Sequence, residues 1–134
     1  MSNNTLDTSF DATTDKETVV NMTNHSYFNL NGDPSKEGTN MWLYLNADNY
    51  TPADSTYMTT GEILPVEGTP MDFRKAHALS QTINDTSFEQ IRNASGYDHN
   101  WCLNTYKDGK GDDTKVCAVL WSPTTKIGLS MYTN

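Results

Sequence analysis

Short segments of alternating apolar and polar residues, separated by residues that favour turns, constrain the fold of this chain more than any other feature. Residues 6–12 (LDTSFDA) alternate with a period of two, and residues 127–132 (IGLSMY) do so again. Successive side chains of a strand point to opposite faces, so this period predicts strands with one buried face. We therefore expect a chain built mainly from strands.

Two hairpins are predicted, one near each end of the chain. Residues 17–22 are expected to pair with residues 6–12 across a turn rich in Thr and Asp. The apolar run 116–121 is the best candidate for a buried strand, and it is expected to pair with residues 127–132. Pro123 lies in the connection between them, where a turn is required.

The middle of the chain is predicted to hold shorter elements and long loops. The expected features are a buried strand at 41–45, a turn at 48–49, a short strand at 62–66 within the loop 51–73, and a weak helix within 75–95. Antiparallel strands with long connections predict a mostly β fold, namely a β-sandwich or part of one. A length of 134 residues suits a single domain.

The charge balance excludes some classes of partner. The formal net charge is −8, and the 9 Lys and Arg residues are scattered along the chain. Nucleic acids and anionic membrane surfaces are bound by clustered positive charge, so neither is an expected partner. A neutral ligand such as a sugar leaves no trace in net charge.

Cys102 and Cys117 are the two cysteines, and we expect two free thiols, because two cysteines do not make a disulfide framework. Residues 1–8 contain no apolar core of a signal peptide, and no apolar run approaches membrane-spanning length. The expected location is the cytoplasm.

His25 is the strongest candidate for a catalytic group among three histidines. Asn24 and Ser26 flank it, and Tyr27 and Phe28 follow. A sugar presents hydroxyl groups around its rim and an apolar face of C–H bonds, so hydrogen-bonding groups beside aromatic rings suit it. An isolated histidine is more often a structural residue, but this context favours a sugar site.

A second mixed polar and aromatic cluster is the segment 96–101 (GYDHNW). Adjacent residues on a strand face opposite sides, so Asp98 and His99 are not expected to enter one pocket. We expect Asp98 in the pocket and a structural role for His99. His99 and Cys102 are spaced like a pair of zinc ligands, but no second pair follows, and a Cys–His nucleophile has no local signature.

Four segments, in this order, resemble the aldose 1-epimerase (galactose mutarotase) family. They are VNMTNHSYFNL at 20–30, YTPAD at 50–54, TGEILPV with GTPMDFR at 60–74, and GYDHN at 96–100. The stretch TNHSYFNL is the hallmark of the family, and the resemblance covers nearly the whole chain. It implies a large antiparallel β-sandwich that interconverts the α and β anomers of free aldoses without a metal or organic cofactor.

The resemblance also implies roles for individual residues. His25 corresponds to the general acid that protonates the ring oxygen, and imidazole titrates close to neutrality, as this role requires. Asp98 corresponds to a residue that binds sugar hydroxyls, and Asn24 and Tyr27 are expected beside the sugar. Glucose and galactose are the expected type of substrate.

The departures from the family pattern concern both ends. The family places a further histidine and an arginine upstream of the hallmark, and a general-base glutamate beyond the closing hairpin. We therefore expect residues 1–134 to be a partial domain, truncated at both ends, impaired as an enzyme on its own and prone to self-association through unpaired strand edges. The alternatives are a carbohydrate-binding or regulatory remnant without turnover, and a degenerate fragment without function.

Overall fold

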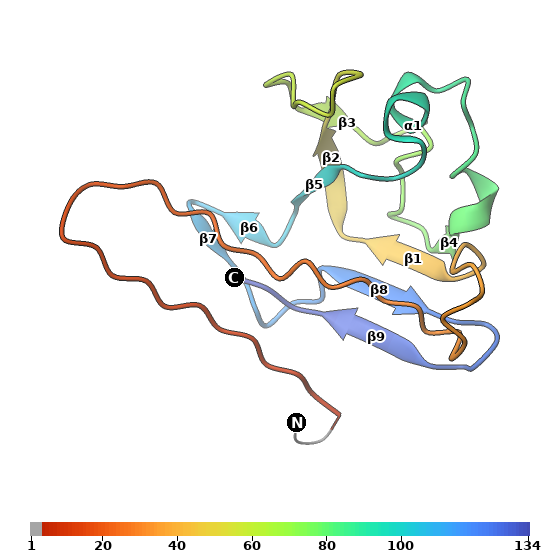
Figure 1. Ribbon diagram of the computed structural model, residues 1–134, viewed down its shortest axis with the longest axis horizontal. Helices are drawn as coiled ribbons and strands as arrows, with labels where there is room; N and C mark the ends of the chain where they lie inside the picture. Colours follow the sequence, from red (N-terminus) through yellow and green to blue (C-terminus); the bar gives the residue numbers. More distant parts are fainter. Residues whose placement is uncertain (1–3) are drawn as a thin grey trace.

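The computed structural model describes residues 4–134 as a β-rich body with a long N-terminal arm (Figure 1). The largest sheet has four antiparallel strands in the order β4-β1-β8-β9. Its strands are β4 (His77–Ala78), β1 (Trp42–Leu45), β8 (Ala118–Trp121) and β9 (Gly128–Met131). Leu43 and Leu120 face one another across β1 and β8, and Leu120 is also paired with Leu129 of β9. The fold is therefore mostly β and antiparallel, as predicted.

A second, three-stranded sheet follows directly from the first, because β1 leads into β2 through Asn46 alone. Its strands, in the order β3-β2-β5, are β3 (Leu64–Pro65), β2 (Ala47–Thr51) and β5 (Asn100–Leu103). A small ribbon of β6 (Tyr106–Lys107) and β7 (Lys110–Gly111) extends beyond β5. The connection between β4 and β5 contains a 3-10 turn, Leu79–Gln81, and the helix α1, Glu89–Ala94.

The buried core lies between the three-stranded sheet and α1. Tyr50, Val66, Met71 and Ile91 form its centre, and each is at most 2% exposed. The aromatic rings of Phe88, Tyr97 and Trp101 pack against this centre together with Leu64. Burying rings of this size is a large source of stability for a chain lean in aliphatic residues.

Several predicted elements are confirmed. The strand expected at 41–45 is β1, the short strand expected at 62–66 contains β3, and the closing hairpin of 116–121 with 127–132 is β8 and β9. The helix expected within 75–95 is the short α1. It ends where Ser95 adopts a left-handed conformation with φ of 52° and the Gly96 N–H donates to the Ile91 carbonyl over 2.9 Å.

The predicted hairpin of 6–12 with 17–22 is wrong. The structure has no strand between residues 4 and 41, and residues 4–29, which we call the N-terminal arm, are exposed throughout. Figure 1 shows the arm (red to orange) running away from the body and folding back toward it. An alternating pattern stabilises a strand only when a neighbouring surface covers its apolar face. Residues 6–8 lie beside the C-terminal residues 132–134, but the side chains of the arm stay exposed.

The predicted turn at 48–49 is also wrong, because Asp48 and Asn49 lie inside β2. Asn49 pairs with Cys102 and with Pro65, and the register shifts between Ala47 and Asn49. Asp48 is thus the extra residue of a β-bulge, a position that tolerates a turn-forming residue within a sheet.

No helix among residues 4–134 combines the length and the apolar character needed to cross a membrane. The cytoplasmic location stays a prediction from the sequence.

Candidate functional site

His25 lies on the N-terminal arm and is exposed. Its ring is 5.1 Å from the ring of Tyr27, at an angle of 50° between the planes. The Asn24 side-chain oxygen accepts a hydrogen bond from the Ser26 N–H over 3.0 Å. The predicted polar and aromatic groups are therefore close together, and the contacts that arrange them are local.

The hallmark segment is anchored to the body just after these residues. The Leu30 carbonyl accepts a hydrogen bond from the Thr125 hydroxyl over 2.6 Å, and the Ser122 hydroxyl donates to Asn31 Oδ1 over 2.7 Å. Ser122 and Thr125 belong to the β8–β9 turn, and Ser122 is fully buried. The anchor fixes the position at which the arm leaves the body, five residues beyond His25.

Asp98 lies between α1 and β5, and its carboxylate makes no hydrogen bond or ion pair among residues 4–134. The preceding residue, Tyr97, is held firmly: its hydroxyl donates to the Pro70 carbonyl over 2.9 Å and is also hydrogen-bonded to Thr82. Burial raises the pKa of the Tyr97 hydroxyl. Asp98 thus presents a free carboxylate from a rigid backbone.

His99 is half-buried, whereas Asp98 is exposed. Its Nε2 lies 3.1 Å from Gln90 Oε1 of α1, and its Nδ1 accepts the Asp98 N–H over 3.3 Å. Gln90 is only 8% exposed, and its Oε1 also accepts the Ala53 N–H over 2.8 Å. These bonds join the segments 50–54 and 96–100 through α1.

Gln90 was not predicted from the sequence. It lies between Phe88 and Ile91, on the short helix whose apolar pattern is weak. Nothing in that pattern distinguishes a buried glutamine from an exposed one. The available indication is that the two segments joined through Gln90, 50–54 and 96–100, both resemble the same family.

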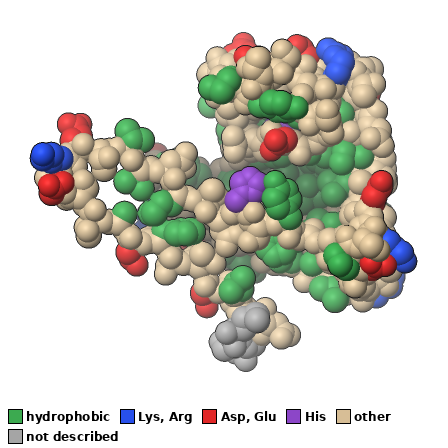
Figure 2. Space-filling model, in the orientation of Figure 1, with side chains coloured by type: hydrophobic (Ala, Val, Ile, Leu, Met, Phe, Trp, Pro, Cys, Tyr) green, Lys and Arg blue, Asp and Glu red, His purple; other side chains and the backbone are tan. Residues whose placement is uncertain are grey.

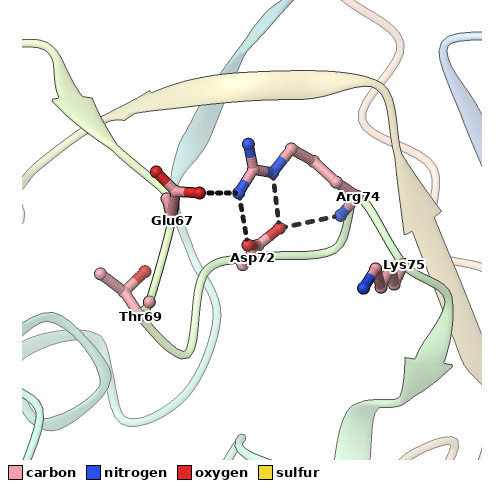
Figure 3. Close-up of a pocket in the computed structure, with 6 residues that line it drawn as sticks. Glu67, Thr69, Asp72, Arg74 and Lys75 are labelled. Atoms are coloured by element: carbon pink, nitrogen blue, oxygen red, sulfur yellow. Dashed lines mark hydrogen bonds and ion pairs between the residues drawn. The ribbon is translucent and has the colours of Figure 1, made fainter.

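Residues of the segment 67–75 line a hollow of about 550 Å³ beside the core (Figure 3). Arg74 meets Asp72 with two parallel bonds, Nε to Oδ1 at 2.9 Å and Nη2 to Oδ2 at 2.7 Å. Asp48 and Glu67 add longer ion pairs with Arg74 at 3.4 and 3.8 Å. The bonds from Arg74 lower the pKa of Asp72.

None of the predicted site residues lines this hollow, and its one arginine is already surrounded by carboxylates. Its geometry indicates a structural role. The Trp101 indole N–H, which donates to the Met71 carbonyl over 3.0 Å, ties the same segment to β5.

The structure thus brings together three of the four segments that resemble the family: those around Ala53, Met71 and Asp98. The fourth, with His25, is attached at its C-terminal end, where Asn29 donates to the Lys36 carbonyl and the Leu30 N–H donates to Met41 Sδ in addition to the anchor. No hydrogen bond or ion pair joins His25 to Asp98 within residues 4–134. Figure 2 shows apolar side chains gathered in the hollow between the upper and lower parts of the body and along the arm. Among the exposed side chains on the arm are Val19, 94% exposed, and Tyr27, 89% exposed.

The free thiols expected from the sequence are observed, with Cys102 half-buried in β5 and Cys117 buried beside β8. Burial raises the pKa of Cys117, and its Sγ donates to the Met131 carbonyl over 3.2 Å. Among residues 4–134, no three His, Cys, Asp or Glu side chains are grouped so that they could hold a metal ion.

Comparison with known proteins gives a consistent result. The chain is 39% identical to the aldose 1-epimerase of Escherichia coli (strain K12) over 131 residues, which are 97% of this chain and 36% of that protein. It is 39% identical to the galactose mutarotase of Homo sapiens over 126 residues, or 87% of this chain and 33% of that protein. The chain therefore spans about a third of the length of these relatives.

The solved structures agree. A galactose 1-epimerase from Lactobacillus acidophilus NCFM superposes with a TM-score of 0.58 at 31% sequence identity, over 74% of this chain and 26% of that one. The family model described as "Aldose 1-epimerase" matches residues 1–134 from end to end. This chain belongs to the aldose 1-epimerase family.

Proposed function

We propose that this chain is part of an aldose 1-epimerase that interconverts the α and β anomers of free aldoses such as glucose and galactose. The observation that carries the proposal is the match to the family over all 134 residues, including TNHSYFNL and GYDHN. Relatives that align with nearly the whole chain are named aldose 1-epimerase and galactose mutarotase, which favours an enzyme over a binding remnant.

In the proposed reaction, His25 donates a proton to the ring oxygen while a base removes the proton of the O1 hydroxyl. The C1–O5 bond breaks and leaves a free aldehyde at C1. Rotation about the C1–C2 bond presents the other face of the carbonyl, and the reverse proton transfers close the ring. Each positioned acid or base contributes about 10²–10⁴-fold to such a rate.

Asp98 is proposed to bind the sugar hydroxyls, with Asn24 and Tyr27 beside the ring. An ionised carboxylate accepts strong hydrogen bonds from hydroxyl groups, and a free one on a rigid backbone orients the ring without first losing another partner. The carboxylate of Asp98 is exposed and without a partner among residues 4–134, which supports this role.

We also propose that residues 1–134 are one part of a larger aldose 1-epimerase domain. The relatives are nearly three times as long, and the N-terminal arm carries exposed apolar side chains such as Phe10 and Val19. Contiguous exposed apolar surface favours association, so we expect the isolated chain to self-associate and to be at most a weak mutarotase.

Polarimetry of freshly dissolved α-D-glucose, with size-exclusion chromatography of the same sample, tests the proposal. His25→Ala, made in a protein that contains the complete domain, should lower kcat by about 10²–10⁴-fold with a smaller effect on KM. His77→Ala is the matched control, because His77 stacks on Phe73, 4.5 Å away, and not on the arm. Equal mutarotation in His25→Ala and in the control would remove His25 from the mechanism.

A further inference from the structure

The hydrogen bonds around His99 admit only one assignment of donors and acceptors. The Asp98 N–H donates to Nδ1 of His99, so Nδ1 carries a lone pair. The proton of a neutral imidazole is then on Nε2, which faces Gln90 Oε1 at 3.1 Å. Gln90 must present its oxygen there, because the same atom accepts the Ala53 N–H over 2.8 Å. The chain of bonds runs in one direction from Asp98 to α1.

Packing holds the side chains of His99 and Gln90 in place. The His99 ring contacts Tyr50 edge-on, with centroids 6.1 Å apart, and Trp101 with centroids 6.3 Å apart. Gln90 is buried, and the neighbouring Asn93 of α1 donates its side-chain N–H to the Ala53 carbonyl over 3.2 Å. Through Gln90 and Asn93, α1 bonds both the N–H and the carbonyl of Ala53, and Gln90 also bonds the His99 ring. The imidazole is therefore held by a helix that is itself bonded to β2's continuation, and its position beside Asp98 is restrained.

We propose that His99 is a positioning residue: its neutral, Nε2-protonated ring fixes the backbone at Asp98 and thereby aims the Asp98 carboxylate at the sugar. The second half of this statement rests on the proposed function, whereas the first half does not. Hydrogen bonds that lock a side chain's own backbone are one way in which a binding group is held in its productive geometry. His99 would then affect sugar binding without contacting the sugar itself.

The arrangement works in one protonation state. The titratable groups around the ring are the Asp98 carboxylate, whose charge acts on it, and Tyr50 of β2, while Gln90 of α1 is uncharged. Burial lowers the pKa of His99 below its usual value of 6.5, although the Asp98 charge opposes this shift. Protonation would place a second donor on Nδ1 against the Asp98 N–H. The bond should therefore be present at neutral pH and lost as the pH falls through the lowered pKa.

Nuclear magnetic resonance on the 134-residue chain, without sugar, tests the first half. The nitrogen signals of the His99 ring should show protonated Nε2 and unprotonated Nδ1 at neutral pH. A protonated Nδ1 would overturn the proposal without any variant having to fold. The Asp98 amide should exchange its hydrogen about two- to tenfold faster in His99→Phe, which keeps a ring in place but removes both bonds. An unchanged exchange rate would also overturn it.

Two further variants separate the two bonds. His99→Asn keeps an acceptor near the position of Nδ1 and should retain protection of the Asp98 amide, whereas His99→Gln reaches Gln90 and should lose it. Tyr106→Phe is the control, since Tyr106 lies on β6, is 60% exposed and should leave the Asp98 amide unchanged. Equal protection in His99→Asn and His99→Gln would contradict the assigned direction of the bonds.

Galactose titration of a protein that contains the complete domain, followed by the Asp98 amide signal, tests the second half. Affinity should fall several-fold in His99→Phe and stay close to wild type in His99→Asn and Tyr106→Phe. If wild type binds galactose and His99→Phe binds it equally well, His99 does not position Asp98 for the sugar. If wild type binds no galactose, the proposed function of the chain fails, and the ring nitrogen and exchange results alone decide whether His99 fixes the Asp98 backbone.

Discussion

Replacing Gln90 should lower the free energy of unfolding strongly, because this buried side chain accepts two hydrogen bonds. Gln90→Met preserves length and flexibility but removes Oε1, which accepts from both the Ala53 N–H and His99 Nε2. A buried donor without a partner costs about 1–3 kcal/mol. Ala53 is 8% exposed, so its N–H should bear the full penalty, whereas the half-buried His99 should bear less. After the small apolar gain from Met, the free energy of unfolding should fall by about 2–4 kcal/mol.

Equilibrium unfolding in urea is the appropriate assay, and Gln81→Met is the matched control. Gln81 is exposed at the end of the 3-10 turn, so the same chemical change there should alter stability by less than about 0.5 kcal/mol. With a slope of about 2 kcal/mol per molar urea, the loss at Gln90 lowers the midpoint by roughly 1–2 M. A Gln90→Met midpoint within experimental error of the control would show that the two donors find other partners. The hydrogen bonds between α1 and Asp98 would then contribute nothing measurable to the free energy of unfolding.

Three further predictions follow from the site and its supports. Asp98→Asn, in a protein with the complete domain, should raise KM with a moderate loss of kcat, because an amide accepts weaker bonds from sugar hydroxyls; an unchanged affinity by sugar titration would place Asp98 outside the pocket. The double variant Cys102→Ser, Cys117→Ser should retain any mutarotase activity by polarimetry, and its complete loss in a still-folded protein would indicate thiol or metal chemistry. Arg74→Lys should destabilise the fold by about 1 kcal/mol at neutral pH, because it loses the paired bonds to Asp72 at a partly exposed site. Because the pKa of Asp72 is lowered in the folded state, this contribution is complete above the ordinary value of 3.8 and is lost as the pH falls through the lowered one. The difference between Arg74→Lys and wild type in urea unfolding should therefore shrink below about pH 4, and a constant difference would contradict the assignment.

The elements that were predicted correctly are those whose pattern and partner are both local. β8 and β9 are joined by a short turn, so apolar runs and turn residues sufficed to predict the hairpin. β2 was missed because Asp48 and Asn49 favour turns, whereas their pairing with β3 and β5 depends on residues far away in the chain. Propensity is overridden when distant strands provide backbone partners on both sides.

The candidate site residues could be predicted from the sequence, but the residues that support them could not. Residue context and family resemblance gave His25 and Asp98 as candidates, and their roles stay predictions. Asp98 and His99 were expected to lie on a strand, but both precede β5, which begins at Asn100. The link from His99 through Gln90 to Ala53 required coordinates, because a buried glutamine and an exposed one look alike in a weak helical pattern. The groups proposed to contact a sugar could be named from the sequence, whereas the groups that hold Asp98 could not.

The two proposed functional residues differ most in how firmly the fold holds them. The backbone at Asp98 is held on one side by the Tyr97 hydroxyl, which bonds to the Pro70 carbonyl, and on the other by the bond from its own N–H to His99. His25 instead lies on the exposed arm, five residues before the anchor at Leu30. Fixing the backbone of one residue costs about 1–2 kcal/mol, so ordering the four residues from His25 to Phe28 costs roughly 4–8 kcal/mol unless packing offsets it. That cost equals a factor of about 10³ or more, which is comparable to the whole contribution of a general acid. In the proposed reaction, sugar binding would depend first on the backbone that holds Asp98, and proton transfer from His25 would depend on a surface that packs against the arm.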